Sequence, residues 1–375
     1  MKVQSRPFSS LEQPVWDGLC ATPGPFVDWR FLASAAEAGC TGPAAGWHPL
    51  ALIENDADGQ PAAGAPAWLK DHSHGEFVFD FAWARAADQI GLPWYPKLLV
   101  AAPFTPVTGP RLLGAEQHPQ AGQRLIATMQ RLVDDHALSS GAVNFCSATD
   151  ADLLRRAGWL ERFDWQYHWH NPGYASFDEF LAGLRRKPRK NIRAERRKAR
   201  EQGWTFRFRS GHELTGAELD LVDSCYRTTF HLYGNRPSLN RAFFELAARR
   251  FGAQFLVCIA ARDNTDLACA IFWRDNDRLY GRYWGSLVDT RDVHFEACYY
   301  QGISYCIEHG LSWFEPGAQG EHKIRRGFLP RKTRSFHYVR DPRMRAGIAD
   351  WLQAEAGMLR EYRQRLEALN PFGDR

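Results

Sequence analysis

The stretch that decides the fold is residues 294–340, HFEACYYQGISYCIEHGLSWFEPGAQGEHKIRRGFLPRKTRSFHYVR. Small, apolar and amphipathic residues recur in its first part at the spacing of one helix face. These are Cys298, Gly302, Tyr305, Cys306 and His309. Gly310 stands where a helix C-cap is expected, directly before an apolar run that starts at Leu311. We therefore expect a helix, a short strand, a glycine-broken polar loop, and a second strand over residues 335–340.

The polar loop between the two expected strands concentrates ionisable side chains. Among glycines 317, 320 and 327 it carries Glu315, Gln319, Glu321, His322, Lys323, Arg325 and Arg326. Ionisable groups in a glycine-bearing loop at a strand end are typical of a site in an α/β fold. A solvated charged loop is the alternative interpretation.

The length and composition indicate a globular protein of two domains. The chain has 375 residues, 45% of them apolar, with 14 Trp and 24 Phe, which is enough for two buried cores. Its first residues contain no apolar run of the signal-peptide kind, and no run of about 18 uncharged apolar residues predicts a membrane span. We expect a cytoplasmic protein without a membrane span.

Eight cysteines are present, and none forms a C-x-x-C pair. They are Cys20, Cys40, Cys146, Cys225, Cys258, Cys269, Cys298 and Cys306. Most lie inside apolar runs, which favours buried thiols of a cytosolic protein over disulfides or zinc ligands. The sequence therefore predicts no metal site.

Positive charge is concentrated in one segment. Residues 185–200, RRKPRKNIRAERRKAR, hold ten Lys/Arg and one Glu, whereas the whole chain has a net charge of only +4. Pro188 favours the start of a helix, and Ile192 is the only strongly apolar residue in the segment. Such a helix cannot bury a wide face, so it is either solvated or bound to an anionic partner.

Histidines and a carboxylate lie close together in the first half, in HSHGE at residues 72–76. If this segment is extended, His72, His74 and Glu76 share one face. That arrangement favours a pocket rim or an acid/base pair. A solvated polar loop is the alternative.

A proline-punctuated segment follows at residues 91–113, GLPWYPKLLVAAPFTPVTGPRLL. Its part from Lys97 to Ala102 predicts a buried strand, and the later prolines predict a stiff loop that ends at Arg111. Such a loop would present Arg111 with Thr105 and Thr108 to an anion. A structural crossover is the alternative.

The order of the expected elements repeats itself. In the second half an antiparallel meander over residues 254–285 leads into a helix, a strand, the polar loop and a last strand. The first half shows strands near 47–53, 65–71 and 97–102, then a helix at 118–136 and strands at 143–146 and 159–170. This repetition indicates a duplicated α/β domain, with boundaries at 1–172 and 173–375.

The second-half order resembles the GNAT acyltransferase fold, and two such domains with a basic helix resemble the Fem-type transferases. The segments that carry the resemblance are SHGEFVFD (73–80), YPKLLVAAPFTPVTGPRLL (95–113), RRKPRKNIRAERRKAREQGW (185–204), EACYYQGISYCIEHGLSWFEPG (296–317) and IRRGFLP (324–330). Over nearly the whole chain they are similar to the FemAB-like predicted N-acyltransferases, also called peptidoglycan biosynthesis/recognition proteins. The resemblance implies two tandem GNAT-like α/β domains with mixed sheets flanked by helices.

Two departures from the related patterns are visible. Fem-type enzymes usually carry Phe-Lys-x-Gly-Phe near the C-terminus, and here Arg325 takes the Lys position in Ile324-Arg-Arg-Gly-Phe328. Arginine stays charged, so it can stabilise an oxyanion or a phosphate but cannot act as a base. The turn at 285–294 lacks the glycines with which acetyl-CoA-dependent GNAT enzymes bind pyrophosphate, which disfavours CoA as the donor.

The resemblance implies aminoacyl transfer from tRNA to an amine acceptor, with a cell-wall peptide precursor as one such acceptor. Direct transfer through a tetrahedral intermediate needs a proton acceptor and an oxyanion partner. We expect Glu315 and His322 to handle protons, and Lys323 and Arg325 to stabilise charge. We expect substrate contacts from His74, Glu76, Lys97, Arg111, Trp284, His294, Glu296, Gln319 and Arg326. We expect polyanion contacts, to tRNA but not DNA, from Arg189, Lys190, Arg193, Arg196, Arg197 and Lys198.

Two other functions fit the same sequence. One is transfer from acyl-CoA to an amine. The other is a non-catalytic module that binds a polyanion or a glycopeptide, since a fold does not fix a function. In each case we expect no tightly bound cofactor, because the donor is a substrate.

Overall fold

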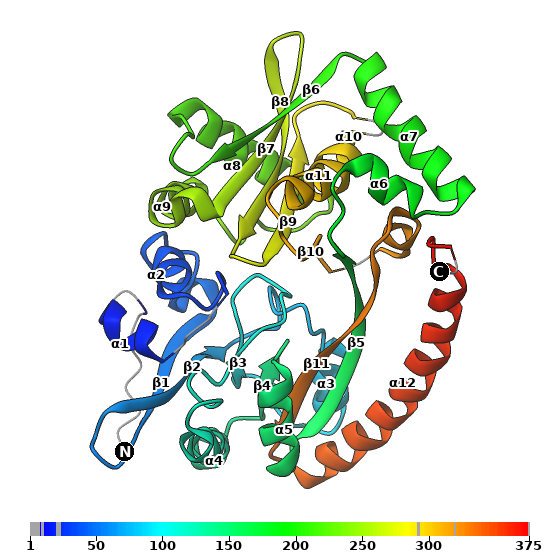
Figure 1. Ribbon diagram of the computed structural model, residues 1–375. Helices are drawn as coiled ribbons and strands as arrows, with labels where there is room; N and C mark the ends of the chain where they lie inside the picture. The colour runs from blue at the N-terminus through cyan, green and yellow to red at the C-terminus, as the bar shows by residue number, and fades with distance from the viewer. Residues whose placement is uncertain (1–7, 9–10, 20–23, 291–292, 319, 374–375) are drawn as a thin grey trace. The chain divides into compact units, whose positions relative to one another are not determined.

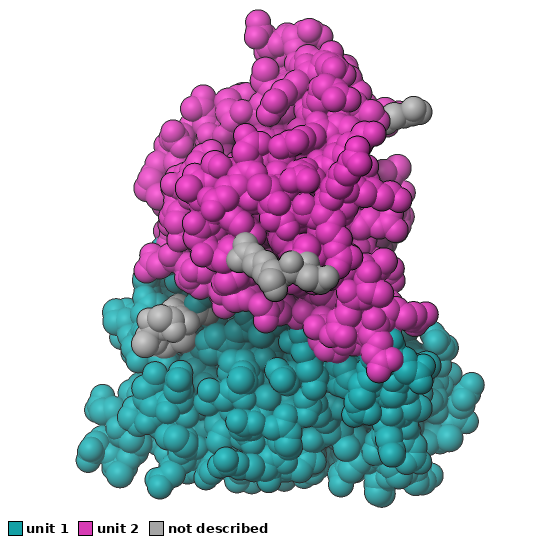
Figure 2. All heavy atoms as spheres, turned by 45° about the vertical axis from the view of Figure 1, so that its right-hand side comes forward, with its two compact units in different colours: residues 1–164, 332–361 teal, residues 165–331, 362–375 magenta. Residues whose placement is uncertain are grey.

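The computed structural model describes residues 8, 11–19, 24–290, 293–318 and 320–373. The chain divides into two compact units, coloured separately in Figure 2: unit 1 comprises residues 1–164 and 332–361, and unit 2 comprises residues 165–331 and 362–375. The sequence analysis instead placed every residue after 172 in one domain. The difference arises because the last strand pairs within unit 1, where Phe336 lies opposite Val143.

Unit 1 is built on a mixed sheet with the strand order β1-β2-β3-β4-β11. Its elements are α1 (Gln13–Gly18), α2 (Trp29–Glu37), β1 (Trp47–Asn55), β2 (Pro61–Lys70), α3 (Phe81–Gln89), β3 (Lys97–Val100), α4 (Pro119–Asp135), β4 (Ser140–Asn144), α5 (Ala148–Arg156), β5 (Leu160–His170), β11 (Leu329–Val339) and α12 (Pro342–Ala368). β5, β11 and α12 each continue from one unit into the other. The parallel pair β3–β4 is joined by helix α4, which supplies the crossover connection that parallel strands need.

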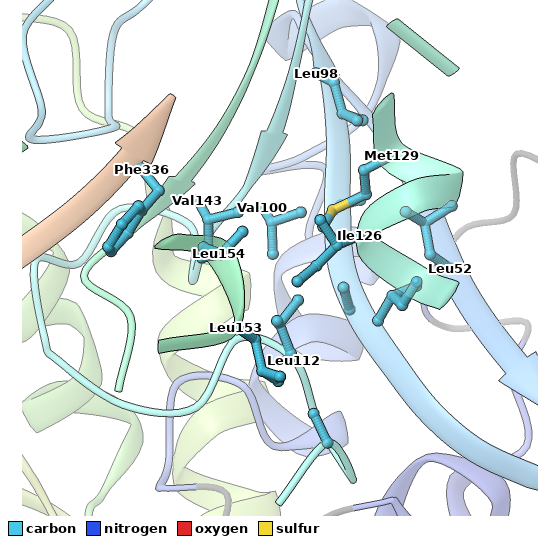
Figure 3. Packing of buried hydrophobic residues seen from close by; sticks show 14 of the residues in the cluster. Leu52, Leu98, Val100, Leu112, Ile126, Met129, Val143, Leu153, Leu154 and Phe336 are labelled. Carbon is cyan, nitrogen blue, oxygen red and sulfur yellow. The ribbon is translucent and has the colours of Figure 1, made fainter. Parts of the chain in front are cut away.

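The core of unit 1 lies between α4, α5 and the sheet. The helix expected at residues 118–136 is confirmed as α4, and its apolar side chains are buried in one cluster with strand residues. Figure 3 shows Ile126 and Met129 of α4 pointing toward Val100 of β3. Phe336 of β11 belongs to the same cluster and is fully buried, so the last strand is part of this core.

Unit 2 has a similar order of strands and helices. Its elements are α6 (Phe177–Ala182), α7 (Arg186–Glu201), β6 (Trp204–Ser210), α8 (Gly216–Leu232), α9 (Arg241–Phe251), β7 (Phe255–Arg262), β8 (Thr265–Arg274), β9 (Arg278–Ser286), α10 (Val293–Phe295), α11 (Gln301–Glu308) and β10 (Trp313–Glu315). The strand order is β10-β9-β8-β7-β6, with the expected antiparallel meander β7–β8–β9 and a parallel β9–β10 pair. The alternating side chains Ala270 and Phe272 of β8 join the core under α11.

The helix expected at the start of the deciding stretch consists of three pieces. α10 is followed by a π-helical turn, Glu296–Tyr300, and then by α11. Gly310 has a positive φ of 67° directly after this helix, as a C-terminal cap of the left-handed type requires. A π-helical turn inserts one extra residue into a helix and often occurs at functional sites. It precedes the strand β10 and the loop that the sequence marked as polar (Figure 1).

Two segments have local structure that the sequence pattern did not specify. The polar loop is not irregular throughout, because residues Glu321–Arg326 form a 3₁₀ helix. The segment 71–80 is not extended, because Gly75 and Phe77 both have positive φ values. His74 is therefore exposed while Glu76 is buried, and these side chains do not share a face. No helix in the described ranges is both long and apolar enough to cross a membrane.

Candidate functional site

Unit 2 contains a pocket of about 440 Å³ beside the basic helix α7. We call it the unit 2 pocket, and its walls are formed by Asn191, Ile192, Glu195, Phe295, Tyr300, Glu321, His322, Arg325, Arg326 and Leu369. The lining residues come from α7, from the start of the central helix with its π-helical turn, and from the 3₁₀ helix. The pocket thus brings together His322, Arg325 and Arg326, three residues that the sequence placed in one site.

His322 lines the pocket as an exposed residue, and its surroundings favour the neutral imidazole. Its Nε2 lies 3.1 Å from the hydroxyl of Tyr299. Burial lowers the pKa of His322 below its ordinary value, and the neighbouring cations Arg326 and Lys323 lower it further. Burial raises the pKa of Tyr299, so its phenol stays protonated at neutral pH. A neutral imidazole beside a hydroxyl can accept a proton from a bound amine.

Arg326 is a buried structural partner. Its Nη2 lies 2.7 Å from Oε1 of Glu195, and its Nη1 donates to the carbonyl oxygen of His322 at 2.9 Å. The guanidinium also lies 3.7 Å from the ring centroid of Phe295 and donates to the hydroxyl of Tyr300 at 3.0 Å. These contacts compensate the positive charge of Arg326, so little of that charge is left to attract a substrate.

Arg325 has the opposite environment. It is exposed and lines the unit 2 pocket, and it makes no ion pair with any residue that the structure describes. Arg325 is therefore a pocket-lining cation whose charge no carboxylate of the described residues compensates.

Two further catalytic candidates lie away from the pocket wall. Lys323 is buried and donates to the carbonyl oxygen of Gly317 at 2.8 Å, and burial lowers its pKa to about 7. Glu315 is buried at the end of β10, where it accepts from Arg278 Nη1 at 3.0 Å. Its Oε2 lies 3.8 Å from Nε2 of His168. Neither Lys323 nor Glu315 belongs to the residues that line the unit 2 pocket.

The expected substrate residues near the central helix form two groups. The ring of His294 packs against Trp284 and Tyr299 at centroid distances of 5.6 and 5.5 Å, and burial lowers its pKa to about 4. Glu296 is buried and pairs with Arg196 at 3.2 Å. These residues support the π-helical turn next to His322. Gln319 lies outside the described residues.

The six expected polyanion residues all lie on α7, but they differ in environment. Lys190, Arg193, Arg197 and Lys198 are exposed, whereas Arg189 is half-buried. Arg196 is also half-buried, because it pairs with Glu296 and lies 4.0 Å from the ring centroid of Phe177. Arg196 therefore joins α7 to the core, and the exposed cations are the ones available to a polyanion.

A buried ionic cluster lies in unit 1 around Lys97. Its Nζ donates to Asp80 at 2.5 Å, to Glu76 at 2.8 Å and to the hydroxyl of Ser73 at 2.8 Å. Two carboxylates thus share one ammonium group. Hydrogen bonds and the Lys97 charge lower the pKa of Asp80 despite its burial, whereas burial raises that of Glu76 to about 7. Glu76 and Lys97 were each expected to contact substrate, but here they bind each other in an enclosed cluster.

Replacing Glu76 with Gln is expected to stabilise unit 1 above pH 7. The folded-state pKa of about 7 lies above the ordinary 4.5, so the folded state loses stability as the pH rises from about 4.5 to 7. The variant lacks this loss. Its free energy of unfolding should therefore come to exceed that of wild type by about 1–3 kcal/mol, at ~1.4 kcal/mol per pKa unit. Urea unfolding at pH 5 and pH 8 measures the difference in the free energy of unfolding between the variant and wild type. A variant less stable than wild type at pH 8 would contradict the prediction.

Arg111 is a structural residue of unit 1. It is buried, and its guanidinium donates to the carbonyl oxygens of Val107, Pro110 and Asn144. Its own backbone N–H donates to Asp150 at 2.8 Å. These hydrogen bonds attach the proline-rich loop to the end of β4. Arg111 therefore fits the alternative of a structural crossover better than that of an anion-binding loop.

The sequence profile of FemAB-like proteins, described as peptidoglycan biosynthesis/recognition, matches residues 7–374. The chain belongs to the FemAB-like family. Its two units contain the mixed sheets flanked by helices that the resemblance implied. No curated protein matches this FemAB-like chain in sequence.

Solved structures share the FemAB-like fold at low sequence identity. FemX superposes with a TM-score of 0.56 at 11% identity, over 90% of this chain and 98% of FemX. L-PGS from Bacillus licheniformis gives 0.55 at 9%, over 91% and 95% of the two chains. The C-terminal domain (DUF2156) of a protein described as a lysylphosphatidylglycerol synthetase, from Agrobacterium fabrum, gives 0.56 at 9%, also over 91% and 95%. At these identities the likeness concerns the fold.

Several residues of the FemAB-like site were missed in the sequence. Glu195 and Tyr300 bind Arg326, and Tyr299 contacts His322. A signal existed for Glu195, because it is the single acidic residue among ten basic ones in residues 185–200. The tyrosines carry no such signal, since apolar helix faces often contain aromatic residues.

Proposed function

We propose that this FemAB-like chain transfers an acyl group, in the first place an aminoacyl group from tRNA, to an amine acceptor in the unit 2 pocket. The observation that carries the proposal is the neutral His322 at the wall of a 440 Å³ pocket bordered by a cationic helix. The family's link to peptidoglycan makes a cell-wall peptide precursor the acceptor class of choice.

The reaction needs one bond exchange and one proton transfer. The acceptor nitrogen attacks the ester carbon, an N–C bond forms, and the C–O bond to the donor ribose breaks. When the Tyr299 hydroxyl accepts from Nε2–H of His322, Nδ1 is left to take the proton of the attacking amine. His322 then returns that proton to the leaving ribose oxygen. Arg325 is the cation that faces the pocket, and it would stabilise the tetrahedral oxyanion.

Direct transfer agrees with the state of the thiols. The described cysteines are buried or half-buried. Burial raises the pKa of Cys146, Cys258, Cys298 and Cys306, and that of Cys269 is raised mainly by its hydrogen bond with Cys225. A covalent acyl-cysteine step would need a thiolate, which such environments disfavour. The proposed mechanism therefore uses no covalent intermediate on the enzyme.

The tRNA donor is tested by salt-dependent binding to α7. In the first variant Lys190, Arg193 and Arg197 are all changed to Gln, while Arg196 is kept because it pairs with the buried Glu296. The slope of log affinity against log salt for bulk tRNA should fall by about 2–3 in magnitude, since each phosphate contact contributes about 0.7–0.9. Fluorescence anisotropy at several salt concentrations gives this slope.

The matched control changes three exposed arginines elsewhere, Arg227, Arg249 and Arg360, to Gln. It alters the net charge equally and should keep the wild-type slope. Transfer is then measured with labelled aminoacyl-tRNA and peptide amines, and acetyl-CoA is titrated in parallel. Saturable CoA binding without tRNA binding would reject the tRNA donor in favour of acyl-CoA. Glycopeptide or tRNA binding without transfer to any amine would leave a binding module.

A further inference from the structure

Helix α7 turns two different sides to its surroundings. Lys190, Arg193 and Arg197 are exposed, whereas Asn191 and Glu195, four residues apart, line the unit 2 pocket. Residues at this spacing lie on one face of a helix. The helix that carries the cationic surface therefore also supplies a carboxylate to the pocket wall.

Glu195 accepts the hydrogen bonds that Arg326 and Tyr300 donate at the pocket wall. Its carboxylate accepts from Arg326 Nη2 at 2.7 Å and Nε at 3.2 Å, and also from the hydroxyl of Tyr300. Arg326 in turn donates to the carbonyl oxygen of His322. A continuous chain of charge-assisted hydrogen bonds thus runs from α7 to the backbone of His322.

We propose that Glu195 is a positioning residue, which holds Arg326 against the carbonyl of His322 and so fixes the 3₁₀ helix that presents the His322 ring to the pocket. The proposal relies on the proposed function for the role of His322. It assigns Arg326 to this same support and leaves Arg325 as the cation that meets the substrate. Misplacing a catalytic group by about 1 Å can cost on the order of 10²-fold in rate.

The charge around the His322 ring makes the role of Glu195 measurable. Four charged or titratable groups act on or contact this ring: Lys323 and Arg326 from its own helix, and His294 and Tyr299 from the central helix. Arg325, Glu321 and Glu195 line the same pocket. Arg326 already lowers the pKa of His322 while Glu195 compensates it. Without that carboxylate the guanidinium acts on the ring at full strength.

The test is an NMR titration of the His322 ring in full-length Glu195→Gln protein. The matched control is Glu201→Gln, on the same helix, where an exposed carboxylate pairs with Arg197 at 3.4 Å. We expect the His322 pKa to fall by about half a unit or more in Glu195→Gln and to stay at the wild-type value in Glu201→Gln. We also expect kcat to fall about 10-fold or more in Glu195→Gln, with an unchanged KM for tRNA.

A lower melting temperature with an unchanged His322 pKa and kcat in Glu195→Gln would overturn the proposal, because a purely structural carboxylate behaves in that way. If Glu195→Gln does not fold, Tyr300→Phe removes one hydrogen bond to Glu195 without a charge, and an unchanged His322 resonance there would also overturn it. The titration needs no substrate. Absence of transfer in the wild-type protein would therefore reject the proposed function and leave this inference to be decided by the titration.

Discussion

Replacing His322 with Gln is expected to lower kcat by about 10²–10⁴-fold, the usual contribution of a general acid–base group. Glutamine can keep a hydrogen bond to Tyr299, which lies 3.1 Å from the His322 ring, but it cannot accept a proton near neutral pH. Because burial and the neighbouring cations lower the pKa of His322, the wild-type rate should stay on its upper plateau at neutral pH and fall only in acid, as the ring becomes protonated. Single-turnover transfer from labelled aminoacyl-tRNA measures the effect.

The control for this variant is His231→Gln, an exposed histidine at the end of α8. It should keep the wild-type rate and pH profile. The tRNA affinity of His322→Gln should also be unchanged, since the exposed cations of α7 are untouched. A variant with more than a third of the wild-type kcat would show that another group takes the amine proton. Lys323, whose pKa is lowered to about 7, would then be the next residue to change.

Replacing Asp80 with Asn is expected to destabilise unit 1 by about 3–5 kcal/mol, the usual cost of removing one partner from a buried ion pair. Asp80 accepts from Lys97 at 2.5 Å, from Ser73 at 2.5 Å and from Trp94 Nε1 at 2.8 Å. An amide would place its own N–H groups among these donors and leave Lys97 with Glu76 alone. The folded-state pKa of Asp80 is lowered, so its stabilisation is present above the ordinary 3.8 and is lost as the pH falls.

Urea unfolding followed by tryptophan fluorescence measures this loss, because Trp94 is bonded to Asp80 itself. Asp152→Asn is the matched control, as its exposed carboxylate pairs with Arg155 on the surface and should contribute less than about 1 kcal/mol. A loss below about 1 kcal/mol in Asp80→Asn would indicate that Lys97 is not charged in the folded protein. Glu76→Gln should then stabilise unit 1 above pH 7 by more, because the Lys97 charge lowers the pKa of Glu76 against the effect of burial.

The periodic parts of the fold could be predicted from the sequence because local burial patterns decide them. The helix predicted at residues 118–136 is α4, and Gly310 marked the end of the central helix, as the structure confirms. The division into units could not be predicted in the same way. It depends on the pairing of residues 335–339 with 140–144, which no local pattern encodes.

The candidate site was predictable in composition but not in arrangement. His322, Arg325 and Arg326 line one pocket and lie within five positions of each other, so their proximity follows from the sequence. Their roles follow from tertiary contacts: Arg326 is compensated by Glu195, which is distant in sequence, while Arg325 has no ion pair among the described residues. Glu315 was expected beside them, but it is turned toward Arg278.

The first half illustrates the same limit. Alternation in HSHGE indicated one shared face, and two positive φ values at Gly75 and Phe77 abolish it. Those turns carry Glu76 inward to Lys97, a contact that depends on a strand 21 residues later. Residue types therefore identified the ionisable groups, whereas the backbone turns decided which of them meet.

The divided course of unit 1 sets an order of folding during synthesis on the ribosome. N-terminal domains usually fold first as the chain emerges. Here β4 cannot pair with β11 until β11 has been synthesised. Cys146, just after β4, is hydrogen-bonded to Arg334 of β11, which lies 188 positions later in the chain. Most of unit 2, residues 165–331, is a single run of chain and is synthesised before that strand. The N-terminal unit therefore stays incomplete until most of unit 2 has been synthesised, and until then the buried place of Phe336 in its core is open to other apolar segments.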